Sequence, residues 1–339
     1  MFNVSKMIVT FVMVSVLLIA FVTGCETEEE PDEEVALEQD GFVLGSGPMG
    51  SGWYPINMTQ GEIWMDELPV TISVVEGDAY GNIRMPARSE ELDMGMTFTA
   101  CFMESQEGIG FFEEDGALDG VKAMTSLYPA FYTIGVLDDS GVEEIEDLVG
   151  KDLYVGPPEG IGEQAFRLVL EQHDITFEDI EEAGGSISHG GYDDGATMLR
   201  DGVVDAMAGS LGTYEVISLM EIDAMTSVDL VSIPEETVNA LVDLELGYAP
   251  GEIPAGVYSG QDEDVNTFSL FAVLVIDEEI SEDDVYALTK TFWENLDRLQ
   301  EEHPERGEFF DVENAMQGVP EDQFHPGALR YFEEVGIVD

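Results

Sequence analysis

Short apolar segments alternate with amphipathic segments of helical length along most of this chain. Runs rich in β-branched and aromatic residues predict strands, because such side chains pack well on a pleated surface. The predicted strands are Phe42–Ser46, Val70–Val75, Leu92–Phe98, Val121–Leu127, Phe131–Leu137, Asp152–Gly156, Val203–Ala208, Val228–Ile233 and Phe268–Ile276. The predicted helices are Tyr54–Met65, Asn82–Ser89, Val142–Val149, Gly162–His173, Asp193–Arg200 and Thr213–Met220. This alternation predicts an α/β fold with mainly parallel sheets.

The C-terminal region has clearer helix signals. Ser281 is a hydroxyl cap with Asp284 three residues later, and apolar residues then recur at helical spacing as far as Leu299. We expect one long helix whose apolar stripe packs in the core. A second helix is predicted to start at His325 and Pro326.

The N-terminus predicts export. An apolar run, Met7–Val22, ends at small residues before Cys25 and is shorter than a membrane span. Residues 1–24 are interpreted as a signal peptide resembling that of a bacterial lipoprotein, in which Cys25 takes the lipid. A short uncleaved anchor is the alternative, and both export the rest of the chain. Residues 25–40 are mostly acidic and predict an extended tether beside the membrane.

The charge balance excludes one class of partner. The chain has 73 Asp and Glu against 11 Lys and Arg, a formal net charge of −62. Nucleic-acid binding is excluded because no basic surface is available to neutralise phosphates. Such self-repulsion destabilises a compact fold unless salt screens it. We interpret the acidity as adaptation to a very saline medium.

Four predicted strand-to-helix junctions are rich in glycine and small polar residues. In open α/β sheets ligands bind at such junctions, where helix N-termini offer unpaired amides to anions. With so few cations, capture of an anion by amides and hydroxyls is the favoured chemistry, and glycine permits close approach of the backbone. The junctions are Gly45–Tyr54, Glu76–Asn82, Gly156–Gly162 and Ala208–Thr213.

Signatures of catalysis, metals and cofactors are weak. No nucleotide-binding loop, nucleophile elbow or cysteine pair occurs, and the four histidines are scattered. The stretch Asp262–Asn266 begins like a calcium loop, but Thr267 stands where glycine is required. Cys101 lies in an apolar context that predicts a buried, inert thiol. We therefore expect no metal, no cofactor and no enzymatic activity, although a hydrolase using paired carboxylates stays open.

Several segments, in order, resemble the TAXI family of solute receptors of TRAP (tripartite ATP-independent periplasmic) transporters. The resemblance covers about residues 42–337. The matching segments are Gly50–Ile56, Leu127–Pro129, Asp139–Gly162, Asp201–Ala206, Ile253–Val265 and His325–Ala328.

The resemblance implies an α/β, periplasmic-binding-protein type II fold with two lobes and a ligand cleft between them. Lobe 1 would comprise residues 41–135 and about 256–339, and lobe 2 residues 136–255. The implied ligand is a small carboxylate such as glutamate or a related amino or dicarboxylic acid. The implied partner is a TRAP permease driven by an ion gradient. A receptor for an ATP-driven (ABC) importer is the alternative, and a secreted hydrolase is a third hypothesis.

We expect ligand contacts in both lobes. Serines, Asn82 and nearby amides would hold carboxylate oxygens, and aromatic side chains would form walls. The candidates are Ser46, Ser51, Trp53, Tyr54, Tyr80, Asn82, Thr97, Ser210 and Tyr258. Asp78 and Glu159 replace hydroxyl and small residues usual in the family. If they face the cleft, an amino acid's ammonium group becomes the better fit; if they face solvent, they belong to the salt adaptation.

Overall fold

The computed structural model describes residues 37–47, 49, 51–158 and 160–338, which form one compact unit. Cys25, the proposed signal peptide and most of the proposed tether lie outside the described residues, as does Glu159. Among the described residues, no helix combines the length and the apolar character that a membrane crossing requires.

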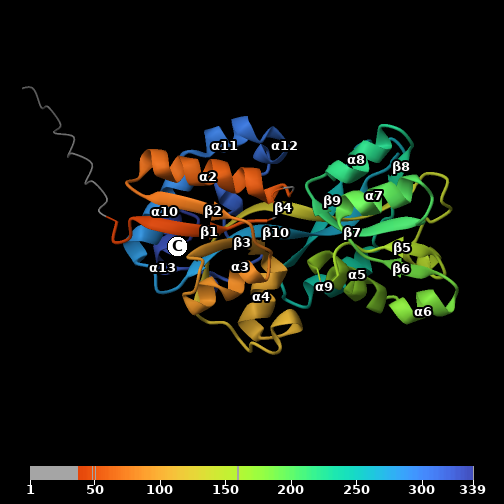
Figure 1. Ribbon diagram of the computed structural model, residues 1–339, viewed down its shortest axis with the longest axis horizontal. Helices are drawn as coiled ribbons and strands as arrows, with labels where there is room; N and C mark the ends of the chain where they lie inside the picture. Colours follow the sequence, from red (N-terminus) through yellow and green to blue (C-terminus); the bar gives the residue numbers. More distant parts are fainter. Residues whose placement is uncertain (1–36, 48, 50, 159, 339) are drawn as a thin grey trace, which may run out of the picture. The chain divides into compact units, whose positions relative to one another are not determined.

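One mixed sheet runs through the unit in the order β2-β1-β3-β10-β4-β7-β5-β6 (Figure 1). Its two ends repeat one arrangement. In the first half, β1 (Gly41–Gly45) pairs in parallel with β2 (Thr71–Val75) and with β3 (Met94–Phe98). In the second half, β5 (Asp152–Tyr154) pairs in parallel with β6 (Ser186–Ser188) and with β7 (Ala206–Gly212). The first strand of each half therefore lies between the second and the third.

Two long antiparallel strands join the halves. Strand β4 (Val121–Leu137) pairs with β10 (Val265–Asp277) up to Phe131, and from there with β7 and β8 (Val228–Leu230). Strand β10 pairs first with β9 (Tyr248–Ile253) and then with β3. The two strands predicted at 121–127 and 131–137 are thus one strand. Register shifts opposite this stretch absorb the irregularity near Pro129, which has no N–H to donate to the ladder.

Helices flank the sheet, and their positions agree with the prediction more closely than their lengths do. Val142–Val149 contains only a 3₁₀ turn at Ile145–Leu148, and the helix predicted from Thr213 starts four residues later. The long C-terminal helix is interrupted at Asn295. The α-helices are α2 (Trp53–Glu67), α3 (Gly81–Arg84), α4 (Thr99–Glu107), α5 (Ile161–Glu171), α6 (Phe177–Glu182), α7 (Tyr192–Arg200), α8 (Ile217–Asp223), α9 (Glu235–Val242), α10 (Glu282–Glu294), α11 (Leu296–Glu302), α12 (Pro304–Gly307) and α13 (Pro326–Glu334).

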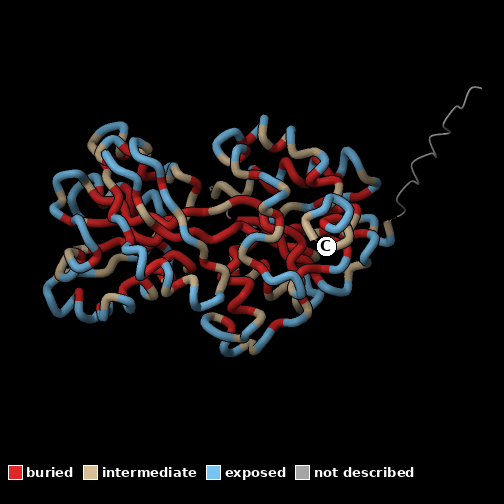
Figure 2. Tube along the Cα trace, turned by 180° about the vertical axis from the view of Figure 1, so that it is seen from behind, coloured by how far each residue is buried: buried red, intermediate tan, exposed pale blue. Residues whose placement is uncertain are grey.

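The core follows the central strands, which are buried along most of their length (Figure 2). Residues of β10 from Thr267 to Ile276 are all buried. Cys101 is fully buried, as predicted, and burial raises the pKa of its thiol to about 12. His325 caps α13 by accepting a hydrogen bond from the Gly327 amide, which confirms the predicted helix start.

Candidate ligand-binding site

Both halves of the sheet have a point where the strand order reverses. These points lie between β1 and β3 and between β5 and β7. Ligands of open α/β sheets bind in the crevice beyond the carboxyl ends of strands at such points. Ser46 directly follows β1, Thr97 is near the end of β3, and Ser210 lies in the last part of β7. Three of the predicted site residues therefore lie where the topology favours binding.

Three predicted serines carry hydroxyls that the described residues do not satisfy. The Oγ atoms of Ser46, Ser51 and Ser210 are buried and make no hydrogen bond within the described part of the chain. Ser46 and Ser210 are at most 1% exposed. Burying an unpaired hydroxyl costs free energy, so native proteins keep such groups mainly where a ligand or water completes them. These hydroxyls are the strongest local mark of a site.

Asn82 acts mainly as a brace between junctions. Its Nδ2 donates to the carbonyl oxygens of Ser46 (2.9 Å) and Met96 (2.8 Å). A Cβ atom on Gly45 or Gly77 would stand 2.3 or 2.2 Å from Asn82 Oδ1. The two glycines therefore make room for a protein side chain, where the sequence suggested close approach of a ligand. Asn82 fixes the carbonyl of Ser46 and so positions that residue.

The two glycine-rich junctions of the second half pack against each other. A Cβ on Gly162 would lie 1.9 Å from the carbonyl oxygen of Gly209, which itself has φ of +85°. The start of α5 thus touches the backbone of β7 directly. Here too, glycine is required for contact between elements, and this contact sets Ser210 beside the first turn of α5.

Carboxylates already occupy two of the predicted helix starts. Asp78 is exposed, and it accepts hydrogen bonds from the amides of Tyr80 (3.0 Å) and Gly81 (2.9 Å) at the start of α3. Glu163 lies in the first turn of α5, where its Oε1 accepts a bond from Arg167 Nη2 at 2.6 Å. The start of α2 differs, because it has neither a side-chain cap nor an acidic residue in its first turn.

The other predicted residues are placed as follows. Trp53 packs against Phe98 with a ring separation of 4.7 Å, and Tyr54 is half-buried on the first turn of α2. The Thr97 hydroxyl donates to the carbonyl of Ala79 at 2.7 Å. Tyr258 lies in the core of the second half, where its hydroxyl accepts from the amide of Val216 at 2.8 Å. Thr97 and Tyr258 thus use their hydroxyls within the protein.

Tyr80 forms a polar contact between the halves. Its hydroxyl donates to Gln164 Oε1 on α5 at 2.9 Å, and Gln164 Nε2 donates to Glu104 Oε1 on α4 at 2.5 Å. An aromatic contact also joins the halves: Phe309, near α12, lies 5.0 Å from Tyr214 in the loop after β7. These contacts join the two halves.

Glu104 is a buried carboxylate that the sequence analysis missed. It is 2% exposed, and its Oε2 has no hydrogen-bond partner among the described residues. Burial raises its pKa to about 7, opposed by the bond from Gln164. The nearby hydroxyl of Tyr248 is likewise buried and unpaired. Nothing local in the sequence distinguishes Glu104 from the other acidic residues, since only its burial makes it unusual.

Arg306 is a second residue that the sequence did not single out. Its guanidinium lies against the first turn of α2, because a Cβ on Gly52 would stand 2.2 Å from its Nη2. Its side chain is 13% exposed, and Nη1 pairs with the neighbouring Glu305 at 2.9 Å. Arg84, a cation close to the Glu76–Asn82 junction, pairs with Asp115 at 2.7 Å and stacks on Phe112.

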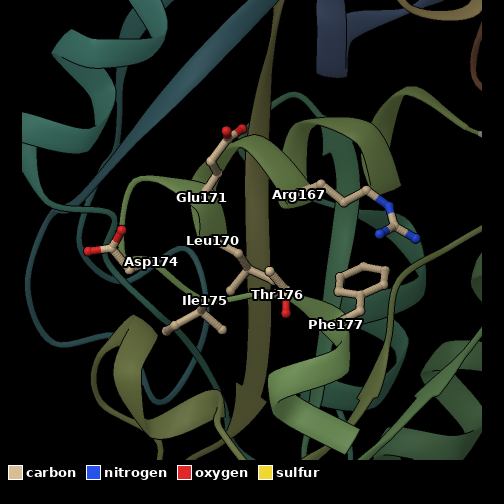
Figure 3. A pocket seen from close by; sticks show the side chains of 7 residues that line it. All are labelled: Arg167, Leu170, Glu171, Asp174, Ile175, Thr176 and Phe177. Carbon is tan, nitrogen blue, oxygen red and sulfur yellow. The ribbon is translucent and has the colours of Figure 1, made fainter.

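A cavity of about 420 Å³ lies elsewhere, between α5 and α6 in the second half (Figure 3). Its lining residues include Arg167, Leu170, Ile175 and Phe177, and none of the predicted site residues. The guanidinium of Arg167 stacks 3.8 Å from the centre of the Phe177 ring. Arg167 is the one cation among the described lining residues, and Phe177 and Glu163 already engage it, so the cavity offers no free cation for an anionic ligand. Among the described residues, no group of three or more His, Cys, Asp or Glu side chains is arranged to hold a metal ion.

Comparison with known proteins decides the family. The profile of the NMT1-like family matches residues 44–336, nearly the whole described unit. This chain belongs to the NMT1-like family. The family match does not distinguish TAXI receptors from other members, so the resemblance to TAXI receptors stays a prediction.

Solved structures share the fold at low sequence identity. PhnD1 from Prochlorococcus marinus, in complex with methylphosphonate, has a TM-score of 0.53 at 9% identity, over 88% of this chain and 99% of its own. A structure described as a periplasmic transporter has a TM-score of 0.50 at 13% identity, over 88% of this chain and 96% of its own. The aliphatic sulphonate binding protein SsuA from Escherichia coli has a TM-score of 0.45 at 12% identity, over 87% and 83%. On the likeness to PhnD1 and to the periplasmic transporter, this NMT1-like chain has the predicted two-lobed, periplasmic-binding-protein type of α/β fold.

Proposed function

We propose that this NMT1-like chain is an extracytoplasmic solute-binding receptor. It would bind a small carboxylate or amino acid between its halves and deliver it to a membrane transporter. The carrying observation is a buried hydroxyl at each switch point, Ser46 in the first half and Ser210 in the second, with no hydrogen-bond partner among the residues that the structure describes. A ligand that bonds to both halves favours the form in which they meet, and a permease can recognise that form.

Two further points support this proposal. The fold relative PhnD1 was solved with methylphosphonate, a small anion. The predicted signal peptide and Cys25 would export the chain and anchor it to the outer face of the cell membrane through a lipid.

The TAXI-like segments favour a TRAP permease as the partner over an ABC importer. Uptake by vesicles containing the permease would separate them, because the first needs an ion gradient and the second needs ATP.

The ligand itself can be identified directly. We expect small molecules released from protein purified in molar KCl to include one acidic or zwitterionic solute in near-equal molar amount, detected by mass spectrometry. Calorimetric titration should then show one saturable site, and prolonged incubation should return the solute unchanged. Consumption of the solute would favour the hydrolase hypothesis. Absence of any bound or titratable solute would contradict the receptor proposal.

Salt dependence tests the interpretation of the acidic composition. We expect the melting temperature to fall strongly when KCl is lowered from about 2 M to about 0.1 M, because the Debye length grows from about 2–3 Å to about 10 Å and the repulsion among 73 carboxylates is no longer screened. Differential scanning fluorimetry across this range measures the effect. Sodium sulfate at equal ionic strength is the control for excluded-solute stabilisation. A melting temperature independent of KCl would refute the saline adaptation.

A further inference from the structure

Arg306 stands in an electrostatically unfavourable position for the protein alone. The N-terminus of a helix carries the positive end of the helix dipole, so a cation there is repelled. Helix α2 is 15 residues long, and the guanidinium of Arg306 lies at Gly52, its N-cap. Several other helices of this acidic chain, among them α5, α7, α9 and α10, have Asp or Glu in the first turn, whereas α2 has none.

The hydrogen-bond donors around this helix start are only partly used. Arg306 is mostly buried, and its one carboxylate partner, Glu305, is its sequence neighbour and half-exposed. The Tyr128 hydroxyl adjoins Arg306 and Trp53. Burial raises the pKa of Tyr128 to about 12, and Arg306 opposes that rise. The buried Oγ atoms of Ser46 and Ser51, in the loop that leads into α2, have no partner among the described residues.

We propose that Arg306, the first amides of α2 and the hydroxyls of Ser46 and Ser51 form the subsite for the ligand's anionic group. This inference rests on the proposed receptor function and names the part of the site that recognises charge. A carboxylate placed there would accept hydrogen bonds from the guanidinium, the amides of Trp53 and Tyr54 and both serines, and its negative charge would offset both the guanidinium and the helix dipole.

The position of Arg306 also links anion binding to contact between the halves. The segment that carries it is attached to α2 through His303, whose ring nitrogen lies 3.0 Å from the Thr59 hydroxyl. Three residues after Arg306, Phe309 packs against Tyr214 of the second half. An anion that holds Arg306 against α2 therefore also steadies the residues that touch the second half.

The test is calorimetric titration of the full folded chain in molar KCl with acetate, succinate, L-glutamate, glutaramide and putrescine as probes. We expect at least one carboxylate to bind. Arg306→Gln should weaken the affinity for that carboxylate about 30-fold, because the charge and its hydrogen bonds are lost. Arg306→Lys should weaken it about tenfold, because lysine keeps the charge but lacks the planar pair of donors that a guanidinium offers to a carboxylate. The matched control is Arg200→Gln at an exposed arginine that pairs with its neighbour Asp201, and it should change the affinity less than twofold.

Thermal melting separates a binding role from a structural one. Without ligand, Arg306→Gln should melt within a few degrees of the wild-type temperature, since removing a cation from a helix N-terminus offsets the loss of its contacts with Glu305 and Tyr128. Equal affinity of Arg306→Gln and wild type for the carboxylate, or a clear loss of ligand-free stability in Arg306→Gln, would overturn the subsite. Binding of glutaramide or putrescine with no carboxylate bound would also overturn it and leave the receptor proposal standing. Binding of no probe, together with no solute released from the purified protein, would defeat both.

Discussion

Replacing Gly162 with alanine is expected to lower the free energy of unfolding by about 3 kcal/mol. The added Cβ would lie 1.9 Å from the carbonyl oxygen of Gly209 and 2.8 Å from its carbonyl carbon. Both atoms belong to the backbone of β7, so no side-chain rotation relieves the overlap. Helix α5 would have to move away from the sheet. Equilibrium unfolding by guanidinium chloride, which keeps the ionic strength high, measures the loss.

Gly191→Ala is the matched control for this prediction. Gly191 lies in the same half with φ of −70°, and an added Cβ would meet only Asp194 Oδ2 at 3.9 Å. Its replacement should cost less than about 1 kcal/mol, the usual effect of alanine at a helix N-cap. Gly162→Ala should also weaken ligand binding, because α5 carries Gln164, which bonds to Tyr80 of the first half. Equal stability of the two variants would show that α5 and β7 are not in direct contact.

Replacing Glu104 with glutamine is expected to stabilise the protein in a pH-dependent manner. Burial raises the pKa of Glu104 to about 7 in the folded protein, whereas an unfolded glutamate titrates near 4.3. Between these values the folded protein keeps a proton that the unfolded chain has lost. The wild-type free energy of unfolding therefore falls as pH rises from about 4.3 to about 7, and the full penalty persists above pH 7.

Glutamine does not titrate, so the variant escapes this penalty. The difference in unfolding free energy, Glu104→Gln minus wild type, should grow across this pH window and become constant above about pH 7, at no more than about 4 kcal/mol. Parallel denaturant titrations from pH 4.5 to 8.5 in molar KCl measure it. Glu107→Gln, an exposed position on the same helix, should show no such trend. A Glu104→Gln difference that does not vary with pH would mean that the carboxylate is solvated or paired with a cation.

The sequence predicted the serines of the candidate site better than it predicted the role of the glycines. Ser46, Ser51 and Ser210 were marked by their place in small, polar junctions, and the structure gives each a buried, unpaired hydroxyl. The same glycine pattern suggested ligand contact at Gly45 and Gly162, where the structure shows internal packing against Asn82 and Gly209. A glycine in the sequence indicates only that another group packs closely against its backbone. Whether that neighbour is a ligand or another part of the chain depends on tertiary contacts.

Local patterns were sufficient for the α/β class and for most of the elements. Alternating strand and helix signals predicted the α/β fold, and the cap at Ser281 and the start at His325 follow from bonds spanning three residues or fewer. Strands β6 and β9 and helices α4, α6 and α9 were not among the predicted elements. For the two strands the pairing partners lie far away in sequence. Weak local preferences become strands there because neighbouring strands satisfy their hydrogen bonds.

The sequence by itself determined the net charge and most of the elements, because these depend on composition or on neighbouring residues, and it predicts an export signal. Tertiary structure alone decided which charged side chains lie in unusual electrostatic environments. Among 73 acidic and 11 basic residues, Glu104 and Arg306 have no local feature that separates them from the rest. They differ because the fold buries Glu104 with one oxygen unpaired and places Arg306 against the start of α2. Burial and the direction of a helix dipole are properties of three-dimensional arrangement, and they set the energy of a charge.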